Sequence, residues 1–138
     1  MPARDLFHDQ IIHALIKDGW TITDDPLHIR WGKRHFYVDL GAERLLAAEK
    51  AERKIAVEIK GFVGKSDVQS LEQALGQFVL YGKVLAEVDP ERILFLAIHE
   101  RAFLAVFDDA MDQLLLRRNL LRLIVFDPDK EEILRWIP

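Results

Sequence analysis

The chain has 138 residues, half hydrophobic and 30% charged, with 19 Lys and Arg against 23 Asp and Glu for a formal net charge of -4, which fits one globular domain over residues 1–138. The absence of cysteine excludes disulfide scaffolds, thiolate zinc sites and cysteine nucleophiles. The sequence shows no signal peptide and no apolar run near the roughly 18 residues of a membrane span, so we expect a cytoplasmic protein with no membrane partner.

The first half of the chain predicts a helix followed by short strands. Apolar residues at helical spacing, such as Ile11 and Leu15, indicate a helix that ends at Gly19. Alternating apolar and polar residues then predict strands separated by turns. Residues 43–52 fit either a short helix or an extended hairpin arm, and we favour the helix. The strands expected in this half span residues 20–23, 27–31, 35–40 and 54–62.

The second half of the chain opens on a helix start signal, in which Ser66 is followed three residues later by Gln69. A broad apolar stripe then predicts the longest helix, which ends before Pro90. The order of elements indicates an α/β or α+β fold, with a mixed sheet flanked by helices. The elements expected after Pro90 are a strand at 92–98, one or two helices within 101–118, and a terminal hairpin of strands 121–126 and 133–137.

Two of the predicted strands carry acidic residues among apolar ones. Because side chains alternate along a strand, Glu58 and Lys60 share one face of strand 54–62. The same alternation in strand 35–40 places Asp39 opposite Val38 and Leu40, which then share a face. Pairing these two strands as neighbours brings the carboxylates of Asp39 and Glu58 together.

This pair of carboxylates suggests a metal site. Two carboxylates a few ångströms apart repel each other, which raises one pKa unless a divalent cation lies between them. Hard oxygen ligands suit Mg²⁺ or Mn²⁺, so we expect Asp39 and Glu58 to bind such an ion. Lys60 would then orient a metal-bound water or stabilise charge on a phosphate. An E-x-K triplet alone is a weak signal, because an exposed pair on an amphipathic strand has the same pattern.

The context of the triplet is more specific. An Asp ends one strand, an E-x-K with an apolar middle residue follows 19 residues later, and a long capped helix comes next. In this arrangement the sequence resembles the PD-(D/E)xK nuclease core, which implies a restriction-endonuclease-like fold with Asp39, Glu58 and Lys60 in the active site. The resemblance extends to Gln77 and Tyr81, a Gln-x-x-x-Tyr pair that faces the active strand in several branches of the superfamily.

Further details of the resemblance are less regular. Val38 stands where the motif has proline, which is tolerable because the metal needs only the carboxylate that follows. Many enzymes of the superfamily present an acidic residue from the first helix, and Asp9 is the candidate here, with a solvated helix residue as the alternative. One such domain offers one active site, so cutting both DNA strands implies a homo-oligomer.

The histidines give no sign of a metal site. His8, His13 and His99 are not spaced along the sequence as metal ligands usually are, so they fit surface or packing positions.

Several longer blocks add a second resemblance. Residues 17–23, 38–43, 54–60, 71–77 and 122–128 are the most specific of them. In these blocks the chain is similar to the XisH family, the cyanobacterial fdxN element excision controlling factor group, over nearly its whole length. The resemblance implies a role in site-specific excision of a DNA element during heterocyst differentiation, alongside a site-specific recombinase and a small companion protein, XisI.

Three functions remain open at this point. The first is Mg²⁺-dependent cleavage of a DNA phosphodiester, in which Gln77 steadies Lys60 or the substrate. The second is a binding or regulatory module that keeps the nuclease fold without cutting DNA. The third is an interaction protein whose exposed strands or helices bind XisI.

The uneven distribution of charge bears on DNA as a partner. Residues 26–65 carry nine basic and five acidic side chains, a local charge of +4, so the remainder carries -8. We therefore expect DNA to contact this segment, with strong salt dependence. The candidate DNA contacts are Arg30, Lys33, Arg34, Lys54 and Lys65.

Overall fold

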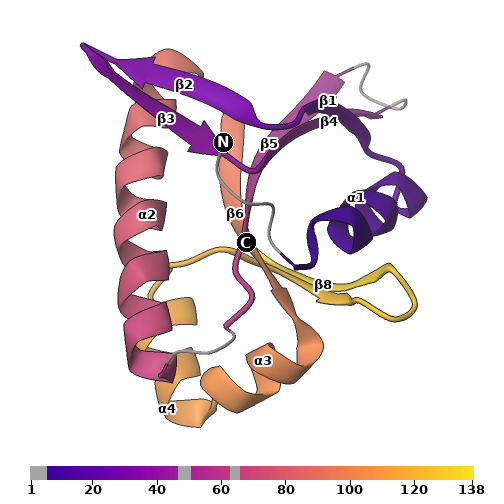
Figure 1. Cartoon of the computed structure of the whole chain (residues 1–138), viewed down its shortest axis with the longest axis vertical. Coiled ribbons are helices and arrows are strands. Elements are labelled where there is room, and N and C mark those ends of the chain that lie inside the picture. The colour runs from indigo at the N-terminus through magenta and orange to yellow at the C-terminus, as the bar shows by residue number, and fades with distance from the viewer. Residues whose placement is uncertain (1–5, 47–50, 63–65) are drawn as a thin grey trace.

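The structure is a computed structural model that describes residues 6–46, 51–62 and 66–138. Its centre is a six-stranded sheet in the order β1-β4-β5-β6-β7-β8, with a separate hairpin of β2 and β3 (Figure 1). β6 runs parallel to both β5 and β7, and the other neighbours are antiparallel. The strands are β1 (Thr21–Asp24), β2 (Leu27–Trp31), β3 (Arg34–Val38), β4 (Leu40–Leu46), β5 (Ala51–Ile59), β6 (Arg92–His99), β7 (Leu123–Asp127) and β8 (Glu132–Ile137).

Helices lie on both faces of this sheet, as Figure 1 shows. α1 covers one face, and the long α2 covers the other, so the predicted mixed sheet flanked by helices is confirmed. Among the described residues, no helix is long and apolar enough to cross a membrane. The helices are α1 (His8–Lys17), α2 (Asp67–Val88), α3 (Glu100–Val106), α4 (Asp109–Met111) and a short π-helical turn, η1 (Asp112–Leu116).

The core is divided by the sheet, and β5 contributes to both sides. Val57 and Ile59 are buried with Ile11 of α1, whereas Ala56 is buried with Phe78 of α2. This alternation follows from the opposite directions of successive side chains in a strand. Glu58, between Val57 and Ile59, therefore points to the side of the sheet that α2 covers.

The start of α2 is set by its sequence. Ser66 is the N-cap, and its Oγ accepts a hydrogen bond of 3.2 Å from the backbone N–H of Gln69. The bond satisfies one of the amides that a first helical turn leaves unpaired. The helix start predicted from this pair of residues is confirmed.

The helix predicted over residues 43–52 is wrong in the described part of that range. Residues 43–46 belong to β4 and residues 51–52 to β5, which pair in an antiparallel ladder. Local helix propensity is a weak preference, and here the ladder to the neighbouring strands outweighs it. Residues 47–50 of the predicted helix lie outside the described residues.

The strand predicted over residues 35–40 is interrupted at Asp39. β3 ends at Val38 and pairs with β2, while β4 begins at Leu40 and pairs with β1 and β5. Val38 is consequently buried on the α2 side of the molecule and Leu40 on the α1 side. The expectation that these two side chains share a face is wrong, because the chain changes sheets at the residue between them.

Candidate active site

Asp39 and Glu58 lie side by side where the chain passes from the hairpin into the central sheet. Leu40 pairs with Val57 in the antiparallel ladder, so the preceding Asp39 lies opposite Glu58. The Asp39 N–H donates to Glu58 Oε1 at 3.1 Å, and the Ile59 N–H donates to Asp39 Oδ2 at 2.8 Å. Each carboxylate is thus held by a backbone amide of the other strand, and the second oxygen of each is not used in these bonds.

The environment of Glu58 opposes its ionisation. The residue is 6% exposed, and burial raises its pKa to about 8, with the negative charge of Asp39 adding to the rise and the Lys60 ammonium opposing it. At neutral pH and without a cation, the Glu58 carboxyl therefore holds its proton. A bound divalent cation would take the place of that proton.

Lys60 follows the end of β5 and points to the same side as Glu58. Its Nζ lies 3.8 Å from Glu58 Oε2, and its side chain is 17% exposed. The Lys60 N–H donates to the Ala97 carbonyl at 2.9 Å and continues the parallel pairing with β6. The backbone of the lysine is therefore fixed, which restricts where its ammonium can reach.

α2 places Tyr81 near the two carboxylates and Gln77 beside Tyr81. Burial raises the pKa of Tyr81, the charges of Glu58 and Asp39 add to this, and a hydrogen bond with the Gln77 side chain opposes it. Gln77 Oε1 is buried and has no hydrogen-bond partner within the described residues. The structure thus brings Asp39, Glu58, Lys60, Gln77 and Tyr81 into one cluster, which we call the carboxylate cluster.

The donor set of the carboxylate cluster fits Mg²⁺ or Mn²⁺. Two carboxylates supply hard oxygens, and Mg²⁺ is ordinarily bound by one or two protein carboxylates, with water and phosphate oxygens completing its shell. The unpartnered Gln77 Oε1 offers an acceptor for such a water. The described residues contain no group of three or more His, Asp or Glu arranged to hold a metal, so water or substrate would have to supply the remaining ligands.

The other predicted site residues lie elsewhere. Asp9 is exposed on α1, which packs on the opposite face of the sheet from Glu58. Lys54 lies on β5 with its Nζ 4.0 Å from Glu91 Oε2, and Lys65 is outside the described residues. The remaining candidates for DNA contact are exposed on the β2–β3 hairpin: Arg30, Lys33 and Arg34.

The histidines set aside at the sequence level each have a partner. His99 caps α3: its Nδ1 accepts from the Ala102 N–H at 3.3 Å, while its Nε2 donates to the Gly61 carbonyl at 3.2 Å. Both ring nitrogens of His99 are therefore used by the backbone. His8 pairs with Asp25 at 2.8 Å, and His13 pairs with Glu131.

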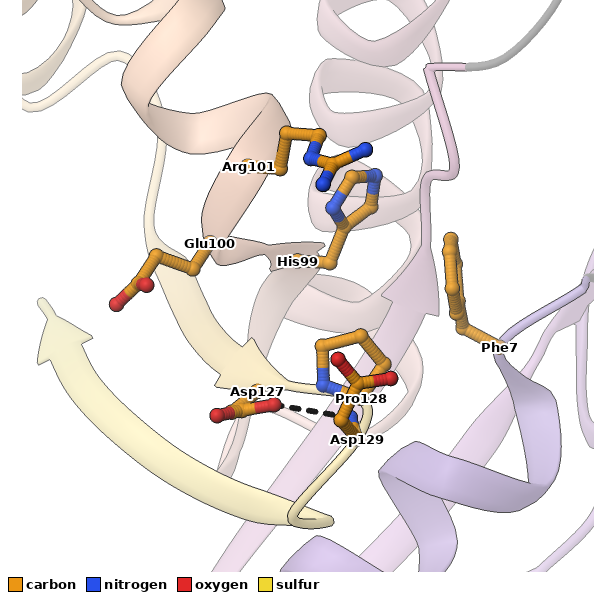
Figure 2. A pocket seen from close by; sticks show the side chains of 7 residues that line it. All are labelled: Phe7, His99, Glu100, Arg101, Asp127, Pro128 and Asp129. Atoms are coloured by element: carbon orange, nitrogen blue, oxygen red, sulfur yellow. Dashed lines mark hydrogen bonds between the residues drawn. The ribbon is translucent and has the colours of Figure 1, made fainter.

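A hollow of about 390 Å³ lies near the end of β6, apart from the carboxylate cluster (Figure 2). Asp127 on its wall already accepts from the Asp129 and Lys130 amides at 2.9 and 3.1 Å, and this turn closes the β7–β8 hairpin. The carboxylate therefore has a structural role at this position. The lining residues are Phe7, His99, Glu100, Arg101, Asp127, Pro128 and Asp129.

One exposed feature was not predicted from the sequence. His28, His35 and Tyr37 form a row of nearly parallel rings on the outer face of the β2–β3 hairpin. The period-two spacing of His28 with Arg30 and of His35 with Tyr37 was the available signal. It becomes informative only with the register His28↔Tyr37 and Arg30↔His35, which the hairpin sets.

Comparisons with known proteins agree over almost the whole chain. The family model described as XisH protein matches residues 1–134. The structure is similar to the crystal structure of an fdxN element excision controlling factor protein from Anabaena variabilis, with 37% identity, a TM-score of 0.85 and coverage of 98% of this chain and 100% of that one. It is also similar to an XisH family protein from Nostoc punctiforme, at 36% identity, TM-score 0.84 and 97% and 100% coverage. No curated protein matches the chain.

Proposed function

The chain belongs to the XisH family, and from this premise we propose that it supports site-specific excision of a DNA element by metal-dependent cleavage of a DNA phosphodiester. The observation that carries the proposal is the carboxylate cluster, in which Asp39, Glu58 and Lys60 are joined by Gln77 and Tyr81 from α2. An Asp, a Glu and a Lys in this order along the chain are typical of a PD-(D/E)xK nuclease, and several branches of the superfamily add the Gln and the Tyr. The setting we propose is excision of a genomic element in a cyanobacterium, during heterocyst differentiation.

Each residue of the carboxylate cluster has a defined part in this proposal. Asp39 and Glu58 would hold Mg²⁺ or Mn²⁺, which would supply polarisation of the phosphate and activation of a water nucleophile. Lys60, beside Glu58, stabilises the negative charge that develops on the phosphate. Tyr81, whose pKa is raised, keeps its proton and donates a hydrogen bond. Gln77 accepts from a water or from Lys60.

Metal binding is the direct test of the site. We expect wild-type protein to bind Mn²⁺ in calorimetry, and Asp39→Asn and Glu58→Gln each to weaken binding at least about tenfold, because each removes a charged ligand. Glu72→Gln, an exposed carboxylate on α2, is the matched control and should bind like the wild type. Mn²⁺ binding that survives both substitutions would show that the ion is held elsewhere.

A second candidate function is a regulatory module that keeps this fold and does not cut. The Anabaena variabilis relative is named a controlling factor, which suits regulation as well as cleavage. Such a protein would act with an XisI-like partner and a site-specific recombinase, and its metal site would support DNA binding alone. Metal binding without cleavage of plasmid or branched DNA would favour this second function.

We also propose that the protein acts on both DNA strands as a homo-oligomer, since one chain offers one carboxylate cluster. Size-exclusion chromatography with light scattering should show a species of more than one chain. A strict monomer, with and without DNA, would count against double-strand cleavage. Co-purification of an XisI-like protein after DNA has been digested would separate direct protein contact from binding through DNA.

A further inference from the structure

The β2–β3 hairpin is basic throughout. Between Pro26 and Val38 the sequence has Arg30, Lys33 and Arg34 and no Asp or Glu, although the whole chain has a net charge of -4. All three basic side chains are exposed. Nothing on the hairpin neutralises them, so this part of the surface is complementary to a polyanion.

The outer face of the hairpin also presents aromatic rings. The His28 ring is nearly parallel to the His35 ring, at a centroid distance of 4.9 Å and an interplanar angle of 13°, and to the Tyr37 ring, at 5.0 Å and 22°. One nitrogen of His28 is hydrogen-bonded to one of His35 at 2.7 Å, which aligns the two rings. Tyr37, at one end of the row, is 51% exposed. The row and Arg30 share one face, because His28 pairs with Tyr37 and Arg30 with His35.

The inner face of the hairpin fixes its position relative to the carboxylate cluster. Leu27, Ile29 and Val38 are buried in the same core as α2, and Phe36 contacts Tyr81 edge-on, with ring centroids 6.1 Å apart. The strand that carries the end of the ring row, β3, runs directly into Asp39. A ligand bound to Tyr37 on the outer face would therefore contact the chain two residues before Asp39 of the proposed metal site.

We propose that the outer face and the tip of the β2–β3 hairpin bind an unpaired strand of DNA, with phosphates on Arg30 of the outer face and on Lys33 and Arg34 at the tip, and with a base stacked on the row of His28, His35 and Tyr37. The inference rests on the proposed function in taking DNA as the polyanion. An unpaired strand is favoured over a duplex because an exposed ring can stack only on a base whose face is free. The absence of acidic residues on the hairpin lets the phosphates approach along its length.

The phosphate contacts can be tested apart from catalysis. Fluorescence anisotropy would measure binding of labelled single-stranded DNA and of a blunt duplex of the same sequence, with EDTA present and in the Lys60→Ala background. We expect the wild-type hairpin to bind the single strand more tightly than the duplex. Lys33→Ala/Arg34→Ala should weaken single-strand binding at least about tenfold and lower the salt slope by about 1 to 2, as expected for two lost phosphate contacts.

The matched control is Arg118→Ala/Arg122→Ala, which removes the same charge from exposed positions outside the hairpin. It should leave affinity and salt slope within about twofold of the parent protein, a size of change typical of surface positions without a specific contact. If both double variants weaken binding equally, overall charge is responsible and the hairpin has no special role.

The stacking contact needs its own variant. Tyr37→Ala should weaken single-strand binding about tenfold while changing duplex binding little, and Tyr37→Trp should retain single-strand binding, because stacking needs a ring and not a hydroxyl. Circular dichroism would verify that each variant is folded. A duplex bound as tightly as the single strand, or a Tyr37→Ala protein that binds single strands normally, would overturn the proposal. Hairpin-dependent binding without any cleavage would instead refute only the nuclease function.

Discussion

Replacing Lys60 by alanine is expected to lower the rate of metal-dependent DNA cleavage by a factor of about 100 to 1,000, the usual cost of removing one preorganised group that stabilises transition-state charge. The ammonium lies 3.8 Å from Glu58 Oε2, and the backbone of Lys60 is fixed by its hydrogen bond to Ala97, so the positive charge is held beside the carboxylate. Metal binding should persist, because both carboxylates remain. The measurement is cleavage of plasmid and branched DNA with saturating Mg²⁺ or Mn²⁺.

Lys83→Ala is the matched control for this experiment. The variant removes the same charge from an exposed position on α2, and Lys83 is not one of the candidate DNA contacts. We expect its cleavage rate to stay within a few-fold of the wild type. Equal cleavage rates in the wild type and Lys60→Ala would rule out a catalytic role for the lysine. Absence of cleavage by the wild type would favour the regulatory function.

The second large effect is on stability, and it comes from Glu58. An unfolded glutamate loses its proton near pH 4.5, whereas the folded Glu58 keeps it to about pH 8. Between these values the folded state binds one more proton than the unfolded state, so the free energy of unfolding falls as pH rises. The contribution of protonated Glu58 to the free energy of unfolding is fully present below about pH 4.5 and is lost as the pH rises through about 8. The free energy of unfolding falls by at most about 1.4 kcal/mol per pH unit and by up to about 5 kcal/mol in total.

Urea denaturation in EDTA, followed by tryptophan fluorescence across this pH range, measures the effect. Glu58→Gln stays neutral at every pH and should lack the fall, so the variant should be more stable than the wild type at alkaline pH and similar to it at acid pH. Adding Mg²⁺ at alkaline pH should restore the stability of the wild type only, since the ion binds the ionised carboxylate. Parallel pH profiles for the two proteins would contradict the raised pKa.

The secondary structure was predictable where its signals are local. The cap formed by Ser66 and the apolar alternation of β5 and β6 depend on a few neighbouring residues, and these elements are where the sequence placed them. The segment over residues 43–52 was not decided in this way: its described residues form the extended hairpin arm that was the alternative to a helix, with Leu45 opposite Glu52 and Leu46 opposite Ala51. Composition favoured a helix there, and pairing with β1 and β5 decided otherwise.

For the candidate site, the alternation of side chains along a strand was enough to predict that Glu58 and Lys60 share a face. The four-residue spacing of Gln77 and Tyr81 likewise predicted one helix face. Three features became visible only in the fold: the change of sheets at Asp39, the burial of Glu58 that raises its pKa, and the alignment of three rings on the hairpin. These features depend on which strands pair and what covers them, and contacts between distant residues carry no local periodicity from which they can be predicted.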